Sequence, residues 1–497
     1  MQLKIQKTRR MKRIIKPFVI MFSAVMLAAS CLSDDTETDI TYYNDTAITS
    51  FSLGTLKRYL TTKAKTQFNE DGTPKDSIYT VSVTGSKYKF YIDQIGRKIY
   101  NTDSLPQNTD AAHVLCSVNT KNNGFVVVKD MESDTLRYFS ESDSLDFTKP
   151  REFRVYASSG VAYRNYTVEV NVHKEDPDSF RWNTAGTCPD AMRMQGMKAL
   201  TFNDKIILCG TDGSKTSLYT TSTDGASSWT AVTTNITLDA QACRSMTAHG
   251  NLLFTVSGGK LIVSTDGQTW HDASMINGMA DLDTPSRLIG SAGMKLYALD
   301  AAGNMVSSEI NGAAWQTEKI SGDKAELPTD NICLASVPLA TDKNSARVIM
   351  TGTRSLETYP EDSVATVWNK IEEYAEGSQE HGWMSCNEQS RYQLPRLANL
   401  KMTKYGDLLV AIGGKGEGTS TAEAFSQIYV SRDNGLTWHA DDRYVLPEDF
   451  TNNGSNLCAI TADKDNFLWI ICGGNGTVWR GRLNKLGWKD PQTSFDK

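Results

Sequence analysis

The sequence predicts an all-β protein, because two kinds of strand pattern fill most of its 497 residues. Between about residue 197 and residue 488, an apolar run, a second strand pattern and a tryptophan recur six times. A four-stranded propeller blade needs about 40–45 residues, so the repeat predicts a six-bladed β-propeller with insertions in its longer copies. Before the repeat, about 130 residues of alternating polar and apolar pattern predict one β-sandwich.

The first thirty residues are a predicted secretory signal. They contain seven lysines and arginines, no acidic residue and, at 18–29, an apolar stretch. A basic segment, a short apolar segment and small residues before a cleavage point make up such a signal, and this stretch is too short to span a bilayer. Met11 is an alternative start, since Met11-Lys12-Arg13 alone supplies the basic segment.

The apolar stretch leads directly to a cysteine, in Leu27-Ala28-Ala29-Ser30-Cys31. This run resembles a bacterial lipobox, in which the cysteine is acylated and becomes the mature N-terminus. Acyl chains hold a protein on a membrane with ~0.8 kcal/mol for each buried CH₂ group, so a membrane is a predicted partner. The acidic residues at 32–37 resemble the export signal of Bacteroidetes-type lipoproteins, which implies the outer face of the outer membrane. The alternative is an ordinary cleaved signal with an incidental cysteine.

The charge of the mature chain excludes nucleic acid as an expected partner. Removal of residues 1–30 takes away seven positive charges, and the formal net charge falls from −6 to −13. Contacts to phosphates need clustered lysine and arginine, and the sequence has no such cluster.

The sequence also predicts no cofactor and no metal. It contains no P-loop, GxSxG, HExxH or dinucleotide-binding motif, and no CxxC pair. His271 and His439 both follow a repeat tryptophan, which places them on different blades and far apart. Cys209 and Cys472 occupy equivalent apolar strands, so we expect both to be buried, and no disulfide pair is assigned.

The predicted domains are a signal at 1–30, a flexible tether at 31–45, a sandwich at 46–175 and a propeller at 180–497. In the sandwich, Phe153 and Val155 alternate on one strand, and Tyr166 and Val168 alternate on the next. This hairpin resembles the end of the immunoglobulin-like domains that are common in Bacteroidetes-type surface lipoproteins. The resemblance implies an immunoglobulin-like fold that spaces the C-terminal domain away from the membrane.

The best-preserved repeat is an Asp-box, which has the form Ser-x-Asp-x-Gly-x-x-Trp. Its aspartate accepts backbone N–H bonds, its glycine takes unusual backbone angles and its tryptophan packs between sheets, so we assign it a structural role. Two of the six copies have no box. The box residues are Ser222, Asp224 and Trp229; Ser264, Asp266 and Trp270; Ser308, Gly312 and Trp315; and Ser431, Asp433, Gly435 and Trp438.

The remaining anchor tryptophans are Trp383 and Trp488. Trp182 resembles a further anchor, but no strand patterns of a blade precede it. We expect it to begin a strand that closes the ring on the last blade, since closure removes open sheet edges. A seven-bladed ring is the alternative.

The repeat resembles the sialidase-like Asp-box propellers, which implies a sialidase or another glycoside hydrolase as an alternative function. Those enzymes carry a Phe/Tyr-Arg-Ile-Pro motif before the first blade, whereas the nearest match here is Phe180-Arg181-Trp182-Asn183. Arg244, Arg287 and Arg396 lie in no motif of that family. We therefore predict no catalytic residue and no enzyme.

The longest insertions mark the predicted ligand face. Residues 354–365 and 415–424 are insertions in adjacent blades, and the segment 387–396 lies between them. Aromatic residues with a few polar groups suit a carbohydrate or a peptide, and function usually resides in such loops. The candidate ligand residues are Tyr359, Arg391, Tyr392 and Phe425. The alternative is drift of loops that have no role.

Over nearly its full length, the chain resembles Bacteroidetes-type surface lipoproteins with an immunoglobulin-like domain and an Asp-box (BNR) propeller, a family without a defined activity. The prediction is a lipid-anchored cell-surface protein that binds a glycan or a protein through its propeller and catalyses no reaction.

Overall fold

The computed structural model of the protein describes residues 41–489 except 71–72, 226–227, 276–283, 310–313, 376 and 388–391. The chain divides into two compact units, of which the first ends at His173 and the second begins at Lys174. The predicted signal, Cys31, Gly312 and Arg391 lie outside the described residues. Within the described ranges, no helix has both the length and the apolar character that a membrane crossing requires.

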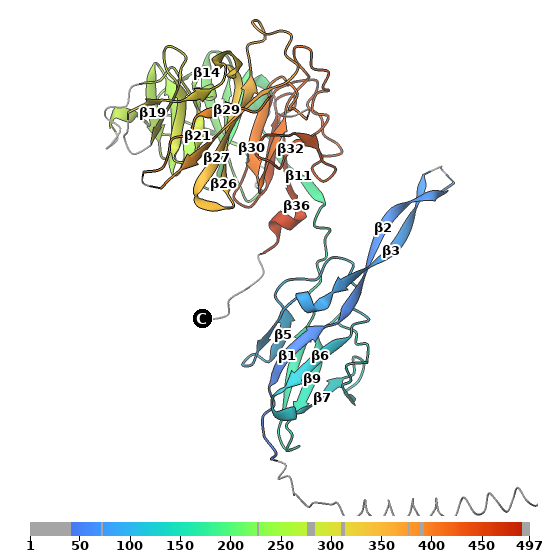
Figure 1. Cartoon of the computed structure of the whole chain (residues 1–497). Coiled ribbons are helices and arrows are strands. Elements are labelled where there is room, and N and C mark those ends of the chain that lie inside the picture. Colours follow the sequence, from blue (N-terminus) through green and yellow to red (C-terminus); the bar gives the residue numbers. More distant parts are fainter. Residues whose placement is uncertain are drawn as a thin grey trace, which may run out of the picture. The chain divides into compact units, whose positions relative to one another are not determined.

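The first unit is built from strands that, in its described part, pair antiparallel with one parallel exception (Figure 1). Its described strands are β1 (Ile48–Leu53), β2 (Thr55–Phe68), β3 (Pro74–Thr84), β4 (Phe90–Asp93), β5 (Lys98–Asn101), β6 (Cys116–Thr120), β7 (Phe125–Lys129), β8 (Leu136–Tyr138), β9 (Arg151–Tyr156) and β10 (Tyr163–Glu169). A six-stranded sheet has the order β4-β5-β10-β9-β7-β8, in which β5 and β10 pair parallel, and β1 pairs with β6. Strands β2 and β3 form a long ribbon that extends beyond the other strands of this unit.

The core of this unit lies between the β1–β6 pair and the six-stranded sheet. Phe51 of β1 packs at 6.0 Å, ring centre to ring centre, from Phe153 of β9. Strands β9 and β10 pair antiparallel, and Phe153, Val155, Tyr166 and Val168 are all buried. The alternation in the sequence therefore predicted this hairpin correctly.

The described strands of the second unit form six sheets of four or five strands each. The strands are β12 (Gly196–Phe202), β13 (Lys205–Thr211), β14 (Lys215–Ser222), β15 (Thr230–Val232) and β16 (Leu238–Asp239); β17 (Thr247–His249), β18 (Leu252–Ser257), β19 (Lys260–Ser264) and β20 (Trp270–Asp272); β21 (Arg287–Ala292), β22 (Lys295–Leu299), β23 (Met305–Glu309) and β24 (Gln316–Thr317); β25 (Ile320–Ser321), β26 (Asp330–Leu339), β27 (Asp342–Thr353), β28 (Thr366–Glu373) and β29 (Trp383–Ser385); β30 (Lys401–Tyr405), β31 (Leu408–Ile412), β32 (Tyr429–Ser431) and β33 (His439–Ala440); and β34 (Cys458–Ala462), β35 (Leu468–Cys472), β36 (Thr477–Leu483) and β11 (Phe180–Thr187).

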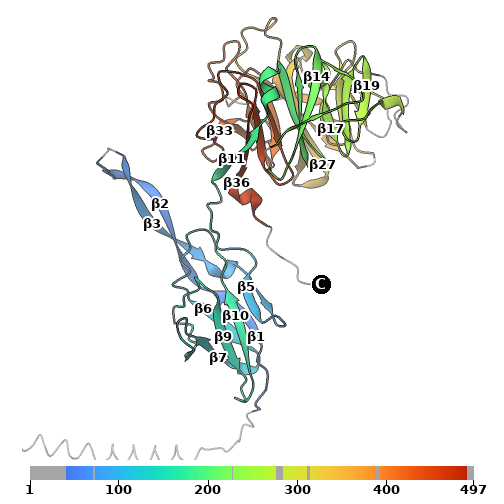
Figure 2. The same ribbon diagram turned by 180° about the vertical axis from the view of Figure 1, so that it is seen from behind.

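The last sheet is completed by the first strand of the unit. Strand β11 pairs antiparallel with β36, and the two strands lie side by side in Figure 1 and in Figure 2. Trp182 lies on this strand, as its position in the sequence predicted. Trp488 follows a 3-10 turn after β36 and so does not stand at the start of a fourth strand, unlike Trp270 and Trp383. The fourth strand of this sheet is β11, from the start of the unit. The prediction that Trp488 is the anchor tryptophan of the sixth repeat was therefore wrong.

The innermost strands of the six sheets form a closed cycle. Strands β12, β17, β21, β26, β30 and β34 contact one another in that order, and β34 contacts β12. The hydroxyls of Thr201 and Thr461 meet near the ends of β12 and β34, and Arg287, at the start of β21, donates to the carbonyl of Thr329, just before β26. The innermost strands therefore run in one direction.

This direction defines two ends of the ring. The "rim end" is where the innermost strands begin, and the "box end" is where they finish. Because consecutive strands in each sheet are antiparallel, the connections from second to third strand lie at the rim end. The turns between third and fourth strand, which hold the Asp-boxes, lie at the box end.

The second strands form the cores between neighbouring sheets. Strands β31 and β35 are buried at every position, and Cys209 and Cys472 are fully buried, as predicted. A strand that is covered on both faces needs apolar residues at successive positions. The sequence therefore predicted these strands from their continuous apolar runs. The eight described cysteines are free thiols.

Candidate functional site

The Asp-box of the fifth sheet satisfies its own polar groups. Asp433 accepts bonds from the backbone N–H of Thr437 at 2.9 Å, from its hydroxyl at 2.6 Å and from the Ser431 hydroxyl at 2.9 Å. The Trp438 indole donates to the carbonyl of Gly435, which has a φ of 90° that favours glycine. The turn therefore holds the buried tryptophan in place.

The second box makes the same network although it is one residue shorter. Asp266 accepts the N–H groups of Gln268 and Thr269 at 2.7 Å each, and the Trp270 indole donates to Gly267. In the first box, by contrast, Asp224 is exposed. Ser308, in the third, donates to the adjacent carbonyl of Glu309, while Trp229 and Trp315 are half-buried.

The same hydrogen bonds set the acidity of the box aspartates. Burial alone would raise the pKa of Asp433, but the bonds from Thr437 and Ser431 outweigh it and lower that pKa below its ordinary value. The backbone bond from Thr269 is the largest cause of the lowered pKa of Asp266. Both carboxylates are therefore stabilised in their charged form by the folded turn.

The two predicted insertions are fastened together at a buried arginine. Arg396 is 1% exposed and donates to the backbone carbonyls of Tyr359 and Arg354, at 2.9 Å each. Its guanidinium lies 3.4 Å from Asp362 in the first insertion and 3.9 Å from Glu417 in the second. The insertions thus form one ordered structure at the rim end.

The predicted ligand residues each contact a different neighbour. Tyr359 lies under the guanidinium of Arg354, 3.7 Å from the ring centre. Tyr392 is 44% exposed and packs 4.5 Å from the ring of His439, whereas Phe425 is half-buried. Tyr359 thus packs on Arg354, Tyr392 on His439 and Phe425 on Phe450, whose ring centre lies 5.5 Å away.

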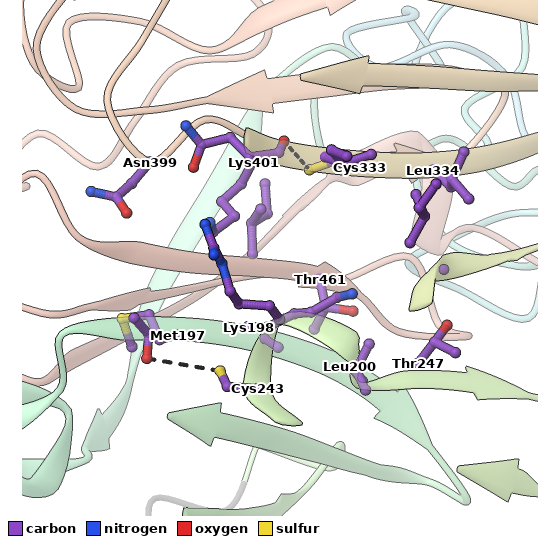
Figure 3. A pocket seen from close by; sticks show the side chains of 18 of the residues that line it. Met197, Lys198, Leu200, Cys243, Thr247, Cys333, Leu334, Asn399, Lys401 and Thr461 are labelled. Carbon is purple, nitrogen blue, oxygen red and sulfur yellow. Dashed lines mark hydrogen bonds between the residues drawn. The ribbon is translucent and has the colours of Figure 1, made fainter. Parts of the chain in front are cut away.

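A cavity of about 630 Å³ lies inside the cycle of innermost strands. All six sheets contribute to its wall, and Figure 3 shows side chains from several of them, including Lys198 of β12 and Lys401 of β30. Four charged residues line this "rim cavity", and all are basic: Lys198, Arg244, Arg287 and Lys401. No acidic and no aromatic residue is among the described residues that line it.

The cations of the rim cavity are poorly compensated. Arg244 pairs with Asp330 at 3.0 Å, but among the described residues the ammonium groups of Lys198 and Lys401 have neither an ion pair nor a hydrogen bond. The Nε of Arg287 is buried without a partner in the same described part of the chain. Burial lowers the pKa of Lys198, and the positive charge of Arg287 lowers it further.

Sequence reasoning did not find this cavity, although a signal for it exists. Lys198, Arg287 and Lys401 each lie within the first three residues of an innermost strand. Equivalent positions in successive blades converge on the ring axis, so three basic residues at this position indicate a cationic channel.

A second cavity of about 630 Å³, here called the "box-end cavity", has mixed charge. Glu372 and Lys370 line it, and behind them Lys370 pairs with the buried Glu318 at 2.7 Å. The Trp383 indole also donates to Glu318, and the Tyr297 hydroxyl donates to Glu372. Burial raises the pKa of Glu372, and the bond from Tyr297 opposes that rise. The two buried groups Lys370 and Glu318 are therefore partners of each other within the protein.

In the described ranges, no group of three or more histidine, cysteine or acidic side chains is arranged to hold a metal ion.

A ring of sheets that is closed by its own N-terminal strand and encloses a polar cavity defines a β-propeller protein. A family model described as the DUF6242 beta propeller domain matches residues 176–491. A second model, the N-terminal domain of the same family of unknown function, matches residues 51–170. The first match covers well over half of the chain, so the chain belongs to this family and its second unit is a β-propeller domain.

Several solved structures from different organisms have a backbone fold similar to that of this chain. An auxiliary nutrient binding protein from Bacteroides ovatus has 9% identity and a TM-score of 0.40, over 78% of this chain and 96% of that one. The α-L-arabinofuranosidase of Fusarium graminearum has 10% identity and a TM-score of 0.35, over 59% and 94%. Trypanosoma rangeli sialidase has 10% identity and a TM-score of 0.33, over 59% and 55%. No curated protein matches the sequence.

Proposed function

We propose that this protein is a non-catalytic binding protein of the cell surface. A lipid on Cys31 anchors it to the outer membrane, and the rim end of its propeller binds a glycan or a protein. The propeller has six blades, one for each sheet of the closed cycle, and the first unit is an immunoglobulin-like sandwich that acts as a spacer.

The rim cavity is the observation that carries the proposal. It is large enough for a small ligand, since binding pockets commonly measure about 300–1,000 Å³. Most glycoside hydrolases need two carboxyl groups that flank the bond to be cleaved. The described residues that line this cavity include no carboxylate, so its chemistry suits recognition and not hydrolysis.

The ordered insertions support binding at the same end. Arg396 holds both insertions rigidly, which lowers the entropy that a ligand must offset when it binds. Tyr392 is exposed, but its carbonyl accepts the backbone N–H of Trp438, so it lies beside the Asp-box turn of the fifth sheet. The Asp-box networks at the box end have their polar groups occupied.

Binding of the purified protein to a glycan array tests this proposal. Tyr359→Ala and Tyr392→Ala should weaken the strongest signal, and Tyr138→Ala, an exposed tyrosine of the first unit, should leave it unchanged. An array signal that neither propeller variant alters would exclude the aromatic residues from the ligand face.

The proposed anchor has a separate test. Cys31→Ser should move the protein from the membrane fraction to the soluble fraction of the cell, because the acylated side chain is lost. Retention of the variant in the membrane fraction would contradict lipid anchoring through this residue.

One observation favours a glycoside hydrolase or sialidase-like enzyme as the second candidate. Sialidases use a paired tyrosine and glutamate, and Tyr297 donates to Glu372 beside the box-end cavity. Tyr297 is fully buried, however, and the nearby cation is Lys370 and not a set of arginines. Hydrolysis of fluorogenic glycosides by the protein that disappears in Glu372→Gln would establish this enzyme.

A further inference from the structure

We propose that the rim cavity binds an acidic oligosaccharide, one whose sugar units carry carboxylate groups, and that Lys198 and Lys401 contact those groups. This inference rests on the proposed function and names the class of its ligand.

The rim cavity carries positive charge that the described residues of the protein do not fully neutralise. Four cations surround one cavity in a chain whose formal net charge is −6, and Asp330 compensates only Arg244. Like charges in a partly buried site repel each other more strongly than in water, because the effective dielectric constant is lower. A bound carboxylate removes this repulsion and accepts charge-assisted hydrogen bonds from the ammonium and guanidinium groups.

Arg287 is held at the wall of the cavity by a backbone carbonyl. Its Nη1 is fixed by the carbonyl of Thr329 at 3.0 Å, while its Nε is buried without a partner among the described residues. The Nε atoms of Arg347, Arg396 and Arg480 are also buried without a hydrogen-bond partner among the described residues, so this atom alone does not mark a site. The bond to Thr329 fixes the Arg287 guanidinium at the wall of the cavity, where its positive charge attracts an anionic ligand.

The rest of the cavity wall indicates the class of anion. Hydroxyl and amide side chains surround the cations, and Figure 3 shows Thr247, Thr461 and Asn399 among them. Such groups donate to and accept from sugar hydroxyls. An acidic sugar needs both kinds of group, which share the wall with apolar side chains such as Met197 and Leu200.

The box-end cavity is the internal control for this reasoning. It has about the same volume, but its buried Lys370 is paired with Glu318 and its His381 lies 2.8 Å from Glu373. The buried Lys370 is paired within the protein, whereas the two lysines of the rim cavity have no partner among the described residues, which favours the rim cavity as the site of an anionic ligand.

Isothermal titration calorimetry with trigalacturonate and with neutral maltotriose tests the inference. The purified protein should bind trigalacturonate and not maltotriose, and the affinity should fall as salt is added. Lys198→Gln/Lys401→Gln should weaken binding by about tenfold or more, since two charged donors are lost. Lys205→Gln/Lys343→Gln removes the same charge from exposed positions on β13 and β27 and should bind as the unchanged protein does.

Each other result overturns a defined part of the account. Equal affinity in the two double variants, or absence of trigalacturonate binding, overturns the acidic-sugar site. Equal binding of a blocked peptide of three glutamates shows that the ligand class is not a sugar. If trigalacturonate fails while neutral glycans bind on the array in a Tyr392-dependent way, the proposed function stands and this inference falls. If none of these ligands binds, the proposal that the propeller binds a glycan and the present inference are both wrong.

Discussion

The two ends of the propeller differ in how their polar groups are satisfied. At the box end, Asp433 and Asp266 are bound by their own turns, and Lys370 is paired with Glu318. At the rim end, Lys198 and Lys401 have no partner among the described residues. Both ends contain ionisable groups in partly buried surroundings, so burial alone does not separate structural from functional residues.

The difference between the two ends separates polar groups that serve the fold from polar groups that are free to bind a ligand. The Asp-box draws attention because enzymes share it. Its side-chain hydrogen bonds, however, join residues of the same eight-residue turn. The rim lysines belong to no motif, yet the fold gathers them around one cavity. A partly buried charged group without a hydrogen bond or an ion pair is a better guide to a binding site than a familiar motif is.

The largest effect is expected at the buried ion pair of the box end. Glu318→Ala leaves the ammonium of Lys370 buried without its partner and should lower the free energy of unfolding by about 3–5 kcal/mol. Urea denaturation at neutral pH measures the change. Glu380→Ala removes an exposed pair with Lys319 and should cost at most about 1 kcal/mol. Equal losses in the two variants would show that the buried pair does not support the fold.

A smaller effect is expected in the box of the fifth sheet. Asp433→Ala removes the acceptor for Thr437 and Ser431 and should lower the free energy of unfolding by about 1–3 kcal/mol. Asp442→Ala, a change of an exposed residue beyond the same turn, should stay within about 0.5 kcal/mol. If both variants unfold at the same urea concentration, the box is dispensable and the contrast between the two ends disappears.

The pH dependence of this box follows from its lowered pKa. A carboxyl group with a lowered pKa in the folded state stabilises the fold above its unfolded pKa, near 3.8, and this contribution is lost as the pH falls through the folded value. Between about pH 5 and about pH 2, the unchanged protein should therefore lose more stability than Asp433→Asn does. Identical slopes in the two proteins would mean that Asp433 is not stabilised in its charged form.

The smallest effect on stability is expected at the rim. Lys198→Gln/Lys401→Gln removes charges that have no partner among the described residues, so the free energy of unfolding should change by less than about 0.5 kcal/mol or should rise. The same urea experiment gives the answer. A loss comparable to that of Glu318→Ala would assign these lysines to the fold.

The sequence predicted those features of the propeller that depend on local pattern. The second strands were found because burial on both faces produces apolar runs such as β31 and β35, and the strand of Trp182 was found from a tryptophan without preceding strands. Local turn chemistry also identified the boxes of Asp266 and Asp433.

The rim cavity and the buried pair of Lys370 and Glu318 depend instead on closure of the ring. Lys198 and Lys401 are separated by about 200 residues, and neither belongs to a motif. Arg396 appeared in the sequence only as an arginine without a motif, yet it fastens two insertions. The basic residues near the starts of β12, β21 and β30 indicate a cavity only when closure of the ring is known to bring these strands around one axis.

The most direct test of the central claim is one set of urea unfolding curves, with and without trigalacturonate, for the unchanged protein and for Lys198→Gln/Lys401→Gln. A ligand that binds only the folded state raises its stability in proportion to the logarithm of its concentration over Kd. Without ligand, the midpoint of the variant should equal or exceed that of the unchanged protein, and with ligand the midpoint should rise in the unchanged protein only. A midpoint that falls in the variant without ligand, or an equal rise in both proteins, would contradict the account.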